Sequence, residues 1–111
     1  MPENLRGKGA ELVSAIRERL GPEPIEVFAP YAGEAAELVL EAIAAAGDDR
    51  AAVTGAILSA QRQNGIFGSY RITDNGNPTV GPVSIFVASD SFEPVREITP
   101  SSRLVAAARG R

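Results

Sequence analysis

Apolar residues recur at helical spacing in three stretches of the first half of the chain. The pattern predicts amphipathic helices over residues 9–20, 31–46 and 50–62. Their apolar faces are formed by Leu12, Val13, Ile16, Leu20, Ala35, Ala36, Val39, Leu40, Ile43, Val53, Ile57 and Ala60. The middle stretch is rich in alanine, so we expect it to allow a neighbouring helix or sheet to approach closely.

The residues between these stretches carry helix stop and start signals. Gly21 and Gly47 stand where a helix-terminating glycine belongs, and Pro22 prevents continuation of the first helix. Asp48 or Asp49 is a suitable N-cap for the third helix because its carboxylate can accept hydrogen bonds from the first turn.

The pattern changes to strict alternation in the second half of the chain. Residues 70–73 and 83–88 alternate as strands do, and a last short strand is predicted over residues 92–98. Asn75-Gly76 is typical of a type I′ hairpin turn, in which both central residues have positive φ. We therefore predict one antiparallel element over residues 65–98 with its turn at Asn75-Gly76.

Glycines and prolines interrupt this part of the chain. Gly65 and Gly68 mark the entry to the first strand and do not form a phosphate loop, since no helix follows them. Pro78 and Pro82 cannot donate to a strand ladder, so the second strand is expected to begin near Val83.

The chain has 111 residues, enough for one small domain. We expect an N-terminal leader over residues 1–8, a single segment over residues 9–98 and a C-terminal tail over residues 99–111, in which a serine can cap one helical turn. Three helices followed by strands would by themselves suggest an α+β fold. Two or three strands are too few to cover the broad apolar faces of three helices. The segment therefore resembles part of a larger layered domain.

Composition narrows the chemistry. The chain has no cysteine and no histidine, so disulfides, thiolate sites and Ser–His–Asp or Cys–His catalysis are excluded. We therefore expect no enzyme, no metal site and no cofactor. The net charge of −3 argues against a nucleic-acid partner. No apolar run is long enough to span a membrane, and the first residues carry no secretory signal pattern.

Four motifs occur in a fixed order: "AELVSAIRERLGPEP", "YAGEAAELVLEAIAAAGDDRAAV", "NGIFGSYRITDNGNP" and "VSIFVASDSFEPV". In this order and spacing they resemble the C-terminal third of the type I substrate-binding proteins of ABC transporters, in particular the branched-chain amino acid (Leu/Ile/Val-type) receptors. The resemblance covers about residues 9–98. It departs from the family at Gly33, where a second Tyr is usual, and at Glu34, where Asp is usual.

The resemblance implies an α/β fold, a partial lobe of a type I periplasmic-binding-protein fold with three helices followed by an antiparallel β hairpin and a short closing strand. The complete receptor has two lobes that close on a small ligand. The resemblance also implies an amino acid as the ligand of the complete receptor, an ABC transporter membrane component as partner, and an extracytoplasmic location in the periplasm or at the cell surface. The strands and polar groups that hold an amino acid's carboxylate and amine belong to the part of the family that this segment does not resemble. A complete ligand site is therefore not expected here.

The candidate ligand-binding residues are Phe28 and Tyr31, at the link into the middle helix. The family places this region at its cleft, and aromatic side chains supply apolar contact area with few rotamers. The simpler alternative is that both residues pack at a helix start. Glu34, Glu37 and Glu41 share one helix face, which we interpret as solvent-exposed.

A second hypothesis is a stand-alone structural or interaction module. The apolar helix faces and the edge strands of such a module would be covered by self-association. We expect a homo-oligomer, most simply a symmetric homodimer.

Overall fold

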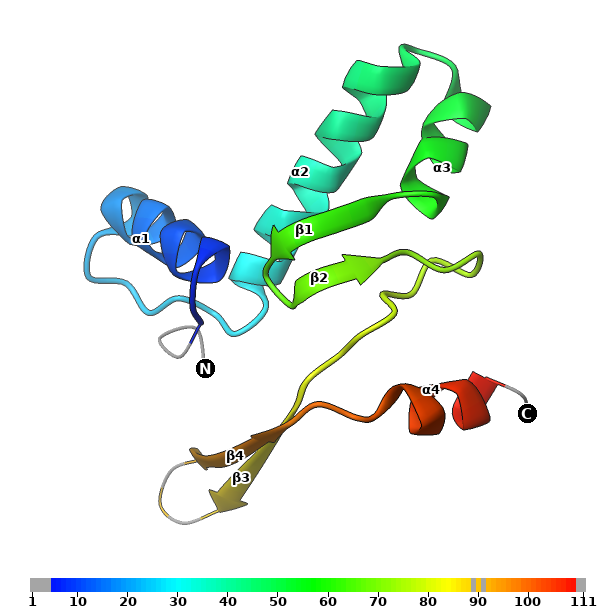
Figure 1. Cartoon of the computed structure of the whole chain (residues 1–111). Coiled ribbons are helices and arrows are strands. Elements are labelled where there is room, and N and C mark those ends of the chain that lie inside the picture. The colour runs from blue at the N-terminus through cyan, green and yellow to red at the C-terminus, as the bar shows by residue number, and fades with distance from the viewer. Residues whose placement is uncertain (1–4, 89, 91, 110–111) are drawn as a thin grey trace.

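The computed structural model describes residues 5–88, 90 and 92–109. Within these ranges the protein is a mixed α/β structure of four helices and two antiparallel hairpins (Figure 1). In chain order the elements are α1 (Lys8–Leu20), α2 (Ala29–Ala46), α3 (Arg50–Leu58), β1 (Gln61–Gly65), β2 (Gly68–Arg71), β3 (Val83–Ala88), β4 (Phe92–Ile98) and α4 (Ser102–Arg109).

The first two helices form where the pattern predicts them, but the apolar face of α2 is solvent-exposed: Ala35, Ala36, Val39, Leu40 and Ile43. α1 ends at Gly21 and α2 ends at Gly47, whose φ angles of 67° and 74° favour glycine. α2 begins two residues earlier than predicted, at Ala29, with Pro30 in its first turn. Proline fits this position because the first amides of a helix have no partner within the helix.

The third helix begins as predicted and ends early. The Asp49 side chain accepts hydrogen bonds from the amides of Ala51 and Ala52 at 2.8 and 3.0 Å, so Asp49 is the N-cap. The predicted end at residue 62 is wrong, because α3 stops at Leu58 and Ser59 closes its last turn onto the Gly55 carbonyl. Four of the residues assigned to the helix thus leave it, and the chain enters β1 at Gln61.

The first hairpin joins β1 to β2 and was not predicted. Gly65 pairs with Gly68 across a short turn, and Arg62 pairs with Tyr70 further along the ladder. The two glycines therefore flank a hairpin turn instead of leading into a single strand. Gly68 has a φ of 81°, and an irregularity in β1 places Asn64 at a φ of 55°.

The predicted turn at Asn75-Gly76 exists, but it closes only a short loop. The Gly76 amide donates to the Thr73 carbonyl at 2.8 Å, and Ile72 bridges to Pro78. Gly76 has a φ of 82°, whereas Asn75 has no positive φ, so the type I′ assignment is wrong.

The predicted pairing across residues 65–98 is also wrong, because β3 pairs with β4 and not with β2. Val83 lies opposite Ile98, and the register shifts at Val95. Pro78 and Pro82 prevent a continuous ladder from β2 to β3 because neither has an amide hydrogen. One hairpin with a closing strand is therefore replaced by two separate hairpins. The last helix, α4, lies in residues 99–111, where a single turn was expected, and Ser101 caps it.

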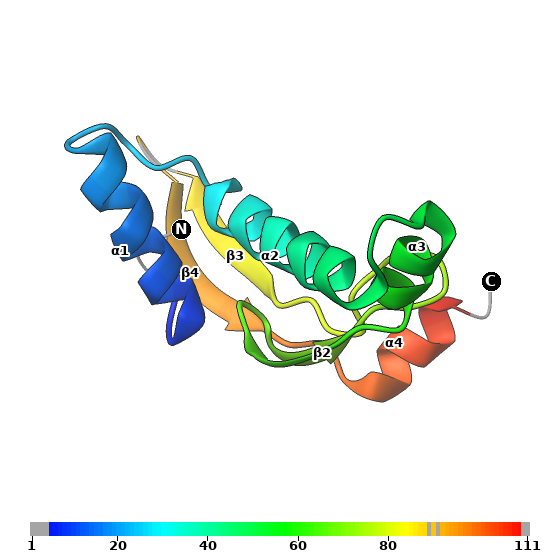
Figure 2. The same cartoon turned by 90° about the horizontal axis from the view of Figure 1, so that it is seen from above.

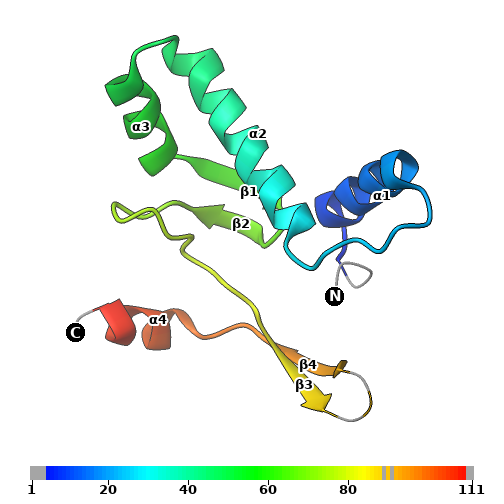
Figure 3. The ribbon, with the colours of Figure 1, turned by 180° about the vertical axis from the view of Figure 1, so that it is seen from behind.

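The molecule is divided into a body, residues 5–79, and an arm, residues 83–98, which is the β3–β4 hairpin. Figures 1 and 3 show the arm standing away from the β1–β2 hairpin, joined to it by one extended segment, and Figure 2 shows the same molecule from above. Among the described residues the apolar core lies in the body: Val13, Ile25, Pro30, Ala42, Ile66 and Tyr70.

The chain is more open than a closed domain of its size. It exposes 8313 Å² of solvent-accessible surface, whereas a compact protein of this mass exposes roughly 5,800 Å². Its radius of gyration is 16.1 Å, against about 13 Å for a compact chain of 100 residues. Large apolar side chains are exposed on both the body and the arm.

The turn after β2 gives a test of local geometry. We expect Gly76→Val to lower the free energy of unfolding by about 1–3 kcal/mol, because a β-branched residue is strained at positive φ. Gly81→Val is the matched control, since Gly81 has open space around its Cα and no positive φ. The measurement is the denaturant midpoint, and equal midpoints for the two variants would contradict the turn geometry.

Candidate functional site

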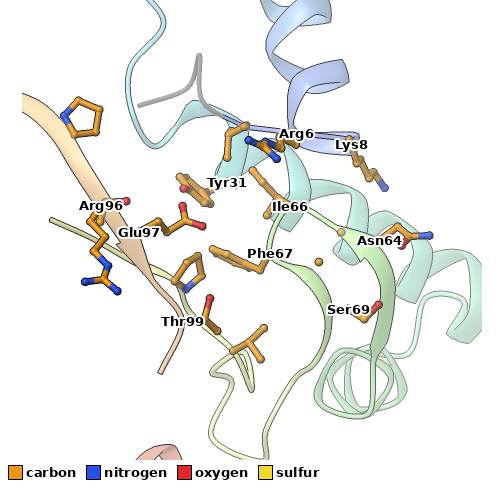
Figure 4. Close-up of a pocket in the computed structure, with 18 of the residues that line it drawn as sticks. Arg6, Lys8, Tyr31, Asn64, Ile66, Phe67, Ser69, Arg96, Glu97 and Thr99 are labelled. Atoms are coloured by element: carbon orange, nitrogen blue, oxygen red, sulfur yellow. The ribbon is translucent and has the colours of Figure 1, made fainter. Parts of the chain in front are cut away.

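An open cavity of about 940 Å³ lies between the body and the arm. The body contributes Tyr31, Asn64, Phe67 and Ser69, and the arm contributes Arg96 and Glu97 (Figure 4). In the close-up the Phe67 ring projects between the two parts, from the turn between β1 and β2. Apolar and charged groups therefore share the walls of this cavity.

Three aromatic rings form a row on the body, and two of them, Tyr31 and Phe67, line the cavity. Tyr31, in the first turn of α2, stacks on Phe67 with ring centroids 5.3 Å apart. Phe67 meets Tyr70 edge to face at 5.7 Å. Such pairs contribute about 0.5–1.5 kcal/mol each beyond their burial. The row therefore fixes the β1–β2 turn against the beginning of α2.

A buried polar cluster lies behind the aromatic row. The Tyr70 hydroxyl donates to the Glu34 carboxylate at 2.7 Å, and Arg62 Nε lies 3.4 Å from the same oxygen. Glu34 is only 3% exposed. Glu34 is one helical turn beyond Tyr31, so a single turn of α2 holds the hairpin both by a ring contact and by a carboxylate.

The guanidinium of Arg62 continues this cluster along α2. Its Nη1 donates to both carboxylate oxygens of Glu41 at 2.6 Å, and its Nη2 donates to Glu37 at 3.3 Å. Lys8, at the start of α1, also pairs with Glu37. The interpretation of the three glutamates as a solvent-exposed face is wrong for Glu34: the three do share one face, but β1 crosses it and brings Arg62 onto it.

The cluster shifts the titration of its members. Burial, followed by the hydrogen bond to Glu34, raises the pKa of Tyr70 to about 12. Burial lowers the pKa of Arg62, but the hydrogen bond and the charges of the glutamates outweigh it, so that pKa rises above its usual value. The hydrogen bond from Arg62 lowers the pKa of Glu41. All three shifts favour the observed pairing of neutral phenol, guanidinium and carboxylates.

Gly65 allows the hairpin to approach this cluster closely. A Cβ atom at Gly65 would lie 2.4 Å from Glu34 Oε1 and 2.8 Å from the Tyr70 ring. Neither neighbour can move freely, since both are buried. Gly65 therefore permits close packing against Glu34 and Tyr70, whereas Gly68 permits the positive φ of the hairpin turn.

The two predicted ligand-binding residues have different surroundings. Tyr31 is half-buried and lines the cavity. Phe28 is 79% exposed at the start of α2 and lies outside the cavity lining. A role in ligand contact remains a prediction for both. Sequence reasoning missed Phe67 and the Arg62 cluster, and the one available signal was an aromatic residue between two glycines at a tight turn.

The described part of the chain holds no group of three or more metal-ligating side chains. None of its helices combines the length and the apolar character needed to cross a membrane. Comparisons with protein-family models, curated proteins and solved structures find no match for the chain.

The Tyr70 phenol reports on the buried cluster. We expect its absorbance titration, isolated by Tyr31→Phe, to have a midpoint near pH 12 in the folded protein and near pH 10 in denaturant. The folded-state pKa is raised, so this contribution to stability is complete below about pH 10 and is lost as pH rises towards the folded value. A midpoint near pH 10 without denaturant would contradict burial of this hydroxyl against Glu34.

Proposed function

We propose that this chain binds a small solute without catalysing a reaction, and that it is the C-terminal segment of a two-lobed receptor of the branched-chain amino acid type. In the complete receptor the ligand is an amino acid, the partner is the membrane component of an ABC transporter, and the location is extracytoplasmic. Neither nucleic acid nor a cofactor takes part. Closure of two lobes on the ligand supplies the mechanism.

One observation carries this proposal: an aromatic wall faces an open cavity in a chain whose surface is too large for a closed domain. Tyr31 and Phe67 form that wall, and the cluster around Glu34 holds it in place. The excess surface is what a segment of a larger lobe leaves when its neighbouring strands are missing. The order of the four motifs supplies the identity of the family.

The chemistry of the cavity decides which part of an amino-acid ligand this chain contacts. Tyr31 and Phe67 offer apolar area to a ligand side chain. An amino acid's carboxylate and ammonium need several aligned polar partners to offset their lost hydration. Under this proposal those partners come from the missing lobe, and the present chain sets the fit for the side chain.

A chimeric receptor tests the proposal. Residues 9–98 replace the corresponding segment of a Leu/Ile/Val-type receptor, and leucine, isoleucine and valine are titrated by calorimetry. We expect the chimera to retain micromolar binding and Tyr31→Ala to weaken it by about 10-fold or more, since burying an aromatic side chain contributes about 1.5–3 kcal/mol. The 111-residue chain alone should bind no tighter than about 1 mM, equivalent to roughly −4 kcal/mol.

Leu40→Ala is the matched control, because Leu40 lies on the same helix and is 65% exposed. It should leave the dissociation constant of the chimera unchanged. A folded chimera that binds none of the three amino acids would overturn the receptor proposal. Micromolar binding by the isolated chain that weakens with Tyr31→Ala would instead show that the site is complete without a second lobe.

A second candidate function is a self-associating interaction module, and the arm favours it. Every residue of β3 is exposed, although five of the six are apolar. A two-stranded hairpin of this kind is marginal by itself in water. A second copy of the chain would cover it.

Analytical sedimentation measures the oligomeric state of the isolated chain directly. We expect the isolated chain to sediment as a dimer at micromolar concentration, because apolar patches of more than a few hundred Å² rarely remain open in monomers. A compact monomer at all concentrations, without binding of a dye that reports apolar surface, would exclude the module.

A further inference from the structure

The two strands of the arm differ in how their free edges are protected. β4 carries Glu93, Pro94, Arg96 and Glu97, and its ladder is irregular at Val95. Charges, proline and bulges are the features that prevent a strand edge from pairing with another chain. β3 has neither charge nor proline and contains no bulged residue. The open edge of the arm is therefore that of β3.

β3 is also self-complementary when paired with a copy of itself. In an antiparallel pair centred on Ile85, Val83 of one copy lies opposite Val87 of the other, and Ile85 lies opposite Ile85. These positions share one face of the strand because side chains alternate. β3 has no charged residue that this register could place opposite a like charge, and the aliphatic row of each copy continues into the next.

The chain as a whole exposes roughly 2,500 Å² more surface than a compact protein of its mass. A stable interface removes about 800 Å² from each partner, so burial of the arm and of the adjoining surface can supply one. Pairing through β3 places the two apolar strands in the centre of a four-stranded sheet and both β4 strands at its edges. Apolar strands in the middle and charged strands outside are the usual arrangement of an antiparallel sheet.

From this asymmetry we infer that the outer edge of β3 is an interaction surface for a second copy of this chain. The two copies join as an antiparallel β3–β3 pair about a two-fold axis at Ile85. This inference rests on the self-association considered as the second candidate function, and it adds the element, the register and the symmetry.

Cysteine cross-linking tests the register, since the chain has no cysteine of its own. Directly opposed residues of an antiparallel pair have Cα atoms about 4.5–5.5 Å apart, within the range that a disulfide spans. Under mild oxidation Ile85→Cys should double its mass on a non-reducing gel. Val83→Cys alone and Val87→Cys alone should form no disulfide and run at the mass of one chain on this gel, and a mixture of the two variants should cross-link.

Val95→Cys is the matched control, because Val95 lies on β4 and is more exposed than Ile85, at 62% against 44%. It should remain uncross-linked. In sedimentation, Ile85→Lys should shift the chain to monomer and Val95→Lys should not.

The outcomes distinguish failure of self-association from failure of the β3–β3 pairing. A wild-type chain that is monomeric overturns both the module and the β3 edge. A dimer in which Val95→Cys cross-links as readily as Ile85→Cys, or which Ile85→Lys leaves intact, overturns the β3 edge alone.

Discussion

The fold depends on one buried guanidinium. Arg62 leaves β1 and lies along α2, where Glu34, Glu37 and Glu41 are spaced to meet it. Removing one partner from a buried ion pair costs about 3–5 kcal/mol because the other charge is left uncompensated. Without Arg62, the Glu34 carboxylate would be such a charge, since Arg62 is its one described ion-pair partner and the Tyr70 hydroxyl that donates to it is neutral. The pairing therefore fixes where the first hairpin can lie.

The position of that hairpin determines the wall of the cavity. Arg62 and Tyr70 lie opposite each other in the ladder, and both reach Glu34. The turn that follows β1 must then lie over the beginning of α2, where Phe67 stacks on Tyr31. The polar cluster and the aromatic row thus act together. The ion pairs orient the β1–β2 hairpin on α2, and the aromatic rings fill the space between the hairpin turn and the beginning of α2.

The sequence predicts those features that depend on near neighbours. Asp49 capping, the glycine ends of α1 and α2, and the positive φ of Gly76 all follow from local chemistry. β1 was missed because its sequence, Gln-Arg-Gln-Asn-Gly, lacks apolar alternation, and its Arg62 pairs with Glu41 of α2, 21 residues earlier. The burial of Glu34 was missed because its hydrogen-bond partner, Tyr70, is 36 residues away. Of the candidate site, Tyr31 was identified through family resemblance, whereas Phe67 becomes visible only when the hairpin is folded.

Body and arm are stabilised by different means, and this difference bears on both candidate functions. The body holds its own hairpin by buried charges. The strands of the arm are joined by backbone hydrogen bonds, but their side chains are exposed. These apolar side chains therefore contribute little hydrophobic stabilisation until another layer covers them. Under the first candidate function, the rest of a receptor lobe covers the apolar side chains of the arm. Under the second, a second copy of the chain covers them, and it pairs with the free edge of β3.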